Sequence, residues 1–181
     1  REFAAMYESV IRDTAIRSGL NPVEAQEIVQ ETLLPAAKKI AGFDYNPQTG
    51  SFKSWLLTIT RRRIVDHLRK RGRTPGDRPG HGETQALEHV SDPGTARLES
   101  IWNEEWHQAL LEMARTLVKK RVGKRQFEMF ELYAIRQLPM KAVTRALRVN
   151  AAQVYMAKHR VSSSLKRAVA DLEAELARTK G

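Results

Sequence analysis

Glycine and proline are concentrated in one interval of the sequence, from Gly72 to Thr95, where the apolar residues show no periodicity. Both residue types disfavour the interior of a regular element, because glycine is conformationally free and proline lacks an amide hydrogen. The interval predicts a flexible linker, which we place at residues 73–98. It divides the chain into an N-terminal domain, residues 1–72, and a C-terminal domain, residues 99–181.

On both sides of this interval the apolar residues recur at helical spacing, which predicts an all-α fold with two small helical domains. Asn21, followed by Pro22 and Glu24, is a strong start signal for one helix. Pro35 lies inside that helix and should kink it or split it. The residues expected to face the first core are Phe3, Tyr7, Val10, Ile28, Val29, Leu33, Ala36, Ile40, Phe52, Leu56, Ile59, Ile64 and Leu68.

The chain of 181 residues carries a formal net charge of +10 and no cysteine. The basic excess implies an anionic partner, with nucleic acid the first candidate and an acidic membrane surface the second. No apolar run is long enough to cross a bilayer, so membrane insertion is not expected. Without cysteine there is no disulfide, no thiolate zinc site and no cysteine nucleophile, which fits a reducing cytoplasm.

The segment from Gly42 to Arg73 joins an aromatic and polar loop to a helix rich in arginine, capped at its start by Ser51. Flat apolar side chains beside a track of positive charge can hold single-stranded or partly melted nucleic acid. A helix that packs through its aromatic residues and exposes a solvated basic face would show the same pattern. The segment taken alone leaves both interpretations open.

In the C-terminal domain, a stripe of Trp102, Trp106, Leu110, Met113 and Leu117 predicts a buried helix face. From Pro139 to Arg167, the inward positions Val143, Leu147, Val149 and Val154 have the spacing of a helix-turn-helix, in which the second helix enters a major groove. An ordinary helical hairpin has similar spacing, and Arg148 stands near the place of the usual turn glycine. The last helical segment, from Asp171 to Lys180, extends the second helix or forms a partner-binding tail.

Four segments, taken in order, resemble a bacterial RNA polymerase sigma factor of the sigma-70 family, and most closely the extracytoplasmic-function (ECF) group. They are Glu27 to Glu31 (EIVQE), Gly50 to Leu56 (GSFKSWL), Arg61 to Arg69 with Asp66 inside, and Pro139 to Arg167. The sequence departs from the family pattern at Arg62, where an Asn is common, at Pro35 and at Thr144. The departure at Arg62 puts that residue's role in promoter contact in doubt.

The resemblance implies three sets of binding residues. For the minus-ten promoter element they are Phe43, Tyr45, Asn46, Gln48, Thr49, Ser51, Lys53, Trp55, Arg61, Arg62, Arg63 and Arg69. For the minus-thirty-five element they are Asn150, Ala152, Gln153, Tyr155, Lys158, His159 and Arg160. For core RNA polymerase they are Glu27, Gln30 and Glu31.

The function implied by the resemblance is to bind core RNA polymerase, recognise and melt promoter DNA and start transcription in the cytoplasm. No catalysis and no cofactor is expected, and members of the group are often held by an anti-sigma protein. An enzyme such as a nuclease is the first rival, but the histidines and carboxylates form no evident site. A stand-alone helix-turn-helix regulator of duplex DNA is the main alternative. An RNA-binding protein fits the charge but not the helix-turn-helix.

Overall fold

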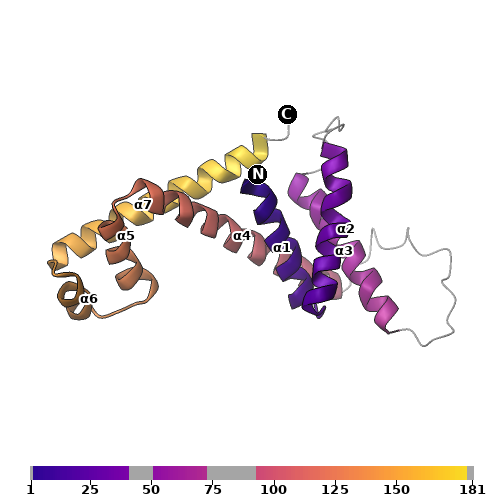
Figure 1. The fold of residues 1–181 in the computed structure, drawn as a ribbon, viewed down its shortest axis with the longest axis horizontal. Helices are drawn as coiled ribbons and strands as arrows, with labels where there is room; N and C mark the ends of the chain where they lie inside the picture. Colours follow the sequence, from indigo (N-terminus) through magenta and orange to yellow (C-terminus); the bar gives the residue numbers. More distant parts are fainter. Residues whose placement is uncertain (1, 41–50, 73–92, 179–181) are drawn as a thin grey trace. The chain divides into compact units, whose positions relative to one another are not determined.

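The structure is a computed structural model that describes residues 2–40, 51–72 and 93–178 (Figure 1). These residues form seven α-helices and one π-helical turn, with no β-strand among them, so the predicted all-α fold is confirmed for this part of the chain. The elements are α1 (Glu2–Arg17), α2 (Pro22–Ile40), α3 (Phe52–Arg71), α4 (Pro93–Arg121), α5 (Lys124–Phe130), η3 (Glu131–Ile135), α6 (Met140–Leu147) and α7 (Ala151–Arg178).

The chain divides into two compact units, Arg1–Ala109 and Leu110–Gly181, with the division inside α4. Residues 93–98 were expected to belong to the linker, and this part of the prediction is wrong, because they form the first turns of α4. Pro93 suits the first position of a helix, and Leu98 gives the new helix a buried apolar residue. The rest of the predicted linker, residues 73–92, lies outside the described residues.

In the first unit, α1 packs against α2, and α2 packs against α3. The core contains fully buried side chains from all three helices, among them Ile11, Ile28, Leu56 and Ile64. The expectation for Leu68 is wrong, since this side chain is 36% exposed. The last turn of α3 is exposed on every side, so an inward spacing no longer leads to burial there. Nothing is described of the Ile40 side chain.

Local signals set the ends of these helices as the sequence predicts. Gly19 adopts a left-handed φ of 103° where α1 ends. Asn21 Oδ1 accepts from the amide of Glu24 at 3.0 Å, and a Glu24 carboxylate oxygen accepts from the amide of Asn21 at 2.8 Å, which is a capping box. Of the two outcomes predicted for Pro35, the split into two helices does not occur, because α2 continues through Pro35 to Ile40.

The tryptophans of α4 are buried, as predicted, but they belong to the first unit. The buried line along α4 runs through Trp102, Trp106 and Leu110 and then through Ala114 and Val118. The expected members Met113 and Leu117 are only partly buried. A spacing of four residues selects Ala114 and Val118 for the innermost positions, and small or β-branched side chains allow close approach there.

In the second unit, α5 packs against α7, and α6 also contacts α7. Met129, Val143, Val154 and Ala157 form a buried cluster, which confirms the inward positions predicted for Val143 and Val154. Leu147 and Val149 pack against the cluster and are partly buried. Helix α7 runs without a break from Ala151 to Arg178, so the predicted final helix is an extension of the same helix.

Candidate nucleic-acid interface

The N-terminus of α3 is fixed by Ser51, whose hydroxyl oxygen accepts a hydrogen bond from the Ser54 amide at 3.2 Å. This cap sets where the arginine-bearing helix begins, and it gives Ser51 a structural role in addition to the DNA contact expected for it. The residues expected to bind the minus-ten element ahead of the cap lie outside the described residues. They are Phe43, Tyr45, Asn46, Gln48 and Thr49.

Four aromatic side chains from three helices of the first unit pack together. The Phe52 ring lies 5.2 Å from Tyr7 and 5.5 Å from Trp55, and Tyr7 lies 5.9 Å from Trp106 of α4, measured between ring centroids. Burial raises the pKa of Tyr7 to about 12. Phe52 and Trp55 are both partly buried, so packing is their first role.

Lys53, the neighbour of Phe52, places its ammonium nitrogen 5.4 Å from the centroid of the Trp106 ring. This geometry is that of a cation–π contact, in which a cation is attracted to the face of an aromatic ring. The residue was expected to contact DNA. The structure gives it a partner on α4.

The arginines of α3 form ion pairs with carboxylates of neighbouring helices. Arg63 Nη1 lies 2.7 Å from Glu31 Oε2 on α2, and Arg61 Nη1 lies 3.6 Å from Glu99 Oε1 on α4. Two of the expected phosphate contacts thus form ion pairs within the first unit. Arg62 and Arg69 are exposed, and Arg62 also has an interaction within the protein. The pair of Arg63 with Glu31 also joins an expected DNA contact to an expected polymerase contact.

Arg71 repeats this arrangement at the C-terminal end of α3. It pairs with Glu24, and its Nη1 donates to the carbonyl oxygen of Gly19 at 3.0 Å. The hydrogen bond from Arg71, followed by that from the Asn21 amide, lowers the pKa of Glu24. The last turn of α3 is therefore held at the junction of α1 and α2 through charge rather than through apolar burial.

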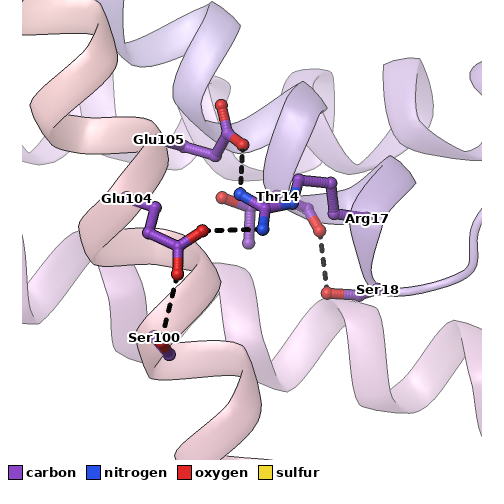
Figure 2. A network of polar contacts seen from close by, with 6 residues as sticks. All are labelled: Thr14, Arg17, Ser18, Ser100, Glu104 and Glu105. Carbon is purple, nitrogen blue, oxygen red and sulfur yellow. Dashed lines mark hydrogen bonds and ion pairs between the residues drawn. The ribbon is translucent and has the colours of Figure 1, made fainter.

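Helix α4 is tied to α1 by Arg17, which bridges two acidic side chains (Figure 2). Its Nη2 lies 2.7 Å from Glu104 Oε2 and its Nη1 lies 2.7 Å from Glu105 Oε1. Hydrogen bonds to Glu105 and Glu104 raise the pKa of Arg17, and the bond from Arg17 lowers that of Glu104. This network was not predicted, although the adjacent carboxylates Glu104 and Glu105 in a basic chain are a usable signal for it.

The exposed side of α2 carries the residues expected to bind polymerase, Glu27, Gln30 and Glu31. It also carries two large apolar side chains, Val23 at 71% and Leu34 at 60% exposure. Eleven residues make about three helical turns, so Val23 and Leu34 share a face with the polar residues between them. Neither was selected from the sequence, because only charged and amide side chains were considered for a binding face on this helix.

In the second unit, the turn between α6 and α7 is closed by Arg148, which adopts the left-handed conformation with φ 50° and ψ 52°. The amide of the next residue, Val149, donates to the carbonyl oxygen of Thr144 at 3.1 Å. The side chain of Val149 packs against the buried cluster of this unit. Arginine thus fills a position where glycine would be unstrained.

Asn150 and Gln153 form a reciprocal cap at the start of α7. Asn150 Oδ1 accepts from the Gln153 amide at 2.8 Å, and Gln153 Oε1 accepts from the Asn150 amide at 3.0 Å. Both residues were expected to contact the minus-thirty-five element. In this structure the side-chain oxygen of each one stabilises the helix start.

The other residues expected to bind the minus-thirty-five element are exposed on α7. Lys158 places Nζ 5.5 Å from the Tyr133 ring, whose centroid is 5.7 Å from that of Tyr155 in an edge-to-face pair. Hydrogen bonding with Tyr155 raises the pKa of Tyr133. Met156, which the sequence analysis did not select, is 52% exposed on the same helix. The remaining members of the set are Ala152, His159 and Arg160.

Comparison with known proteins addresses the first unit. Residues 3–74 match the family model of sigma-70 region 2, and this match covers α1, α2 and α3. These residues are similar to sigma-70 region 2. A probable RNA polymerase sigma factor of Haemophilus influenzae is 39% identical over 49 residues, which are 27% of this chain and 24% of that protein.

The match is a likeness to one region of the sigma-70 family, whose members are not enzymes. The chain spans about a quarter of the length of the curated relative. The first half of α4 lies beyond the family match and yet belongs to the same compact unit, to which it contributes Trp102 and Trp106.

The described residues also bear on two other classes of site. They contain no group of three or more acidic, histidine or cysteine side chains that could hold a metal ion. No helix among them has the length and apolar content needed to cross a membrane.

Proposed function

We propose that this protein is a sigma factor of the ECF type, which binds core RNA polymerase and directs promoter recognition, promoter melting and transcription initiation in the cytoplasm. The observation that carries the proposal is the match of α1, α2 and α3 to sigma-70 region 2, on a chain whose formal net charge is +10. In the domain assignment, residues 1–72 bind polymerase and the minus-ten element. The minus-thirty-five element is bound within residues 99–181, by the part that lies in the second unit. An anti-sigma protein is a further candidate partner.

The minus-ten element is assigned to the loop ahead of Ser51 and to α3. Aromatic and amide side chains of the loop would hold an unstacked base, and Arg61, Arg62, Arg63 and Arg69 would hold phosphates. The ion pairs of Arg61 and Arg63 are compatible with this role, because exposed pairs are worth only about 0–1 kcal/mol and exchange readily for a phosphate. Trp55 and Lys53 would contact DNA at the edge of the aromatic packing.

The minus-thirty-five element is assigned to α6 and α7 as a helix-turn-helix. Support comes from the buried Val143, Val154 and Ala157 at the junction of the two helices, and from the exposed basic side chains of α7. Lys158 and Arg160 are suited to guanine edges or phosphates. For Asn150 and Gln153, the capping bonds use the side-chain oxygens, so their amide nitrogens are the groups proposed to donate to DNA.

Core polymerase is assigned to the exposed face of α2, where Glu27, Gln30 and Glu31 would meet a basic protein surface. Val23 and Leu34 add apolar area to the same face. Acidic groups give selectivity and a fast encounter with a basic surface, and buried apolar side chains supply affinity. The combination is what a protein-binding helix needs on a chain that is otherwise basic.

The decisive experiment is a pull-down of bacterial core RNA polymerase followed by run-off transcription from a genomic fragment library. Binding together with discrete new start sites would support the sigma role and identify both promoter elements. Failure to bind core at low salt, with tight binding to a duplex operator, would instead favour a stand-alone helix-turn-helix regulator.

Charge reversal on α2 tests the polymerase-binding surface within the same experiment. Glu27→Lys should reduce core binding by about tenfold or more, because a like charge would then face the basic partner surface. Glu27 is the better site than Glu31, because Glu31→Lys also removes the ion pair with Arg63. The matched control is Glu173→Lys, an exposed carboxylate on α7. Equal core binding by all variants would reject the surface.

A further inference from the structure

The turn between α6 and α7 contains a conformational conflict. Arg148 has φ 50° and ψ 52°, a left-handed conformation that places the Cβ of any residue except glycine too close to the following carbonyl oxygen. The turn nevertheless has to keep one geometry, because it sets the direction of the first residues of α7. Some other contact must compensate for the unfavourable backbone.

Arg125, at the start of α5, supplies such a contact from 22 residues away in the sequence. Its Nη2 donates to the carbonyl oxygen of Leu147 at 2.7 Å and approaches that of Arg148 at 3.4 Å. These carbonyls close α6 and enter the turn, where the backbone acceptors of a helix have no partner within the helix itself. One guanidinium group thus contacts the backbone on both sides of the peptide bond that joins the helix to the turn.

The electrostatics of the position favour the same arrangement. The C-terminal end of a helix carries partial negative charge on its carbonyl groups, and a cation placed there is stabilised. Among the residues that the structure describes, no carboxylate forms an ion pair with Arg125. The described hydrogen bonds of Arg125 are those to the turn, so its guanidinium group stabilises the backbone of the turn.

We propose that Arg125 is a positioning residue, which holds the α6–α7 turn and thereby orients the N-terminal residues of α7 toward DNA. The proposal rests on the function proposed above for α7. It separates Arg125 from the basic residues of α7 itself, because Arg125 acts through the backbone of the turn and neutralises no phosphate. Affinity for DNA therefore depends on Arg125, but the number of counterions released on binding does not.

The experiment compares Arg125→Met, Arg148→Gly and the double variant in the full chain. The control is Lys124→Met, a neighbouring exposed cation with no described partner. Hydrogen exchange measures the turn without DNA: we expect Arg125→Met to speed exchange of the Val149 and Asn150 amides by about tenfold, and Lys124→Met to leave it unchanged. Glycine at position 148 removes the conflict, so the double variant should return toward the slower exchange.

The second measurement is the affinity of polymerase carrying each variant for a promoter found by run-off transcription. Arg125→Met should weaken promoter binding by about fivefold to tenfold with an unchanged salt dependence. The double variant should bind almost as well as Arg148→Gly alone, because glycine at position 148 no longer needs the contact from Arg125. A fall in the salt slope by about one would make Arg125 a phosphate contact and overturn the proposal.

The two measurements also separate this proposal from the sigma role. Unchanged exchange in the turn of Arg125→Met overturns the positioning role, whatever the DNA result. If polymerase carrying the wild-type protein starts transcription at no promoter but the turn of Arg125→Met loosens as expected, the sigma assignment fails and Arg125 only stabilises the turn, which also overturns its role in DNA orientation.

Discussion

The arginines of α3 and the basic residues of α7 are similar in sequence and different in structure. On α3, Arg61, Arg63 and Arg71 each pair with a carboxylate from another helix. On the described part of α7, no basic side chain pairs with a carboxylate; Lys158 instead lies over the Tyr133 ring. A run of positive charge can therefore join helices or remain open to solvent, and the run itself does not distinguish these roles.

The difference has a physical origin in the neighbouring helices. α2 and α4 present acidic side chains to α3, whereas α7 exposes its basic residues on the side opposite its buried residues. Exposed pairs contribute only about 0–1 kcal/mol each, so the α3 arginines are available to a competing phosphate. Substitutions of the paired arginines in α3 should therefore affect both stability and nucleic-acid binding, whereas substitutions of the exposed basic residues of α7 should affect binding more than stability.

The largest effect is expected from Trp102→Ala, which removes a fully buried side chain of the first unit. The free energy of unfolding of this unit should fall by about 3–5 kcal/mol, as measured by chemical denaturation with circular dichroism and tryptophan fluorescence. Trp102 also anchors α4, the helix that carries Glu99, Glu104 and Glu105, which are the ion-pair partners of Arg61 and Arg17.

The control for this substitution is Trp102→Phe, which keeps most of the volume and removes the indole nitrogen, a buried donor with no described partner. It should be much milder. If Trp102→Ala left the stability of the first unit unchanged, α4 would not be part of that unit. Arg61 and Arg17 would then have no carboxylate partners on α4, and the contrast between α3 and α7 would be weaker.

The second effect concerns DNA affinity through α7. Replacing Lys158 and Arg160 with Ala should weaken binding of the minus-thirty-five element by about tenfold or more and reduce the salt slope by about two, because two phosphate-neutralising charges are lost. Measurements of binding at several salt concentrations test this, with unfolding curves run in parallel. Unchanged affinity would place the DNA-reading surface elsewhere, and lost stability would remove the contrast with α3.

The third effect is smaller and is specific to α3. Arg63→Gln should lower the stability of the first unit by about 0.2–1 kcal/mol through loss of the pair with Glu31, and it should also weaken binding to single-stranded minus-ten DNA. Glu31→Gln breaks the same pair from the other side and should instead strengthen binding to this DNA by a few-fold, since Arg63 no longer has a competing anion. Equal weakening by both variants would contradict the competition.

The last effect is a pH dependence of the first unit that is absent at neutral pH. The pKa of Tyr7 in the folded protein is about 12, above the ordinary value of 10.0, because the folded state disfavours the phenolate. The corresponding stability is present below pH 10 and is lost as the pH rises toward 12. Tyr7→Phe should remove this part of the alkaline loss, as measured by unfolding at pH 9 to 11. An identical alkaline loss in the variant would exclude Tyr7 as its source.

The helix ends were predictable from sequence because their signals are local. Asn21 with Glu24, and Ser51, form the bonds that the sequence predicts, since donor and acceptor lie within three residues of each other. The all-α class followed from the spacing of apolar residues for the same reason. Pro35 is the exception, because the packing of α2 outweighs the local preference of proline to end a helix.

The partners of the candidate site could not be predicted in the same way. Periodicity correctly predicts that Trp102 is buried, but it does not say against which helices. Arg63 and Glu31 are 32 residues apart, and Arg71 and Glu24 are 47 apart, so their pairing depends on how α2 and α3 pack. Val23 and Leu34 were missed because an apolar residue at helical spacing is compatible with burial and with a binding face alike.

Because α7 is one unbroken helix, it fixes both the distance and the rotation between the residues at its two ends. Its 28 residues make a rod roughly 42 Å long, in which each added residue advances the azimuth by about 100°. One residue inserted after Leu165 would turn everything beyond it by that angle and leave the residues before it in place, whereas four would nearly restore the original phase. Whatever binds the two ends of this rod must therefore agree in rotation as well as in distance.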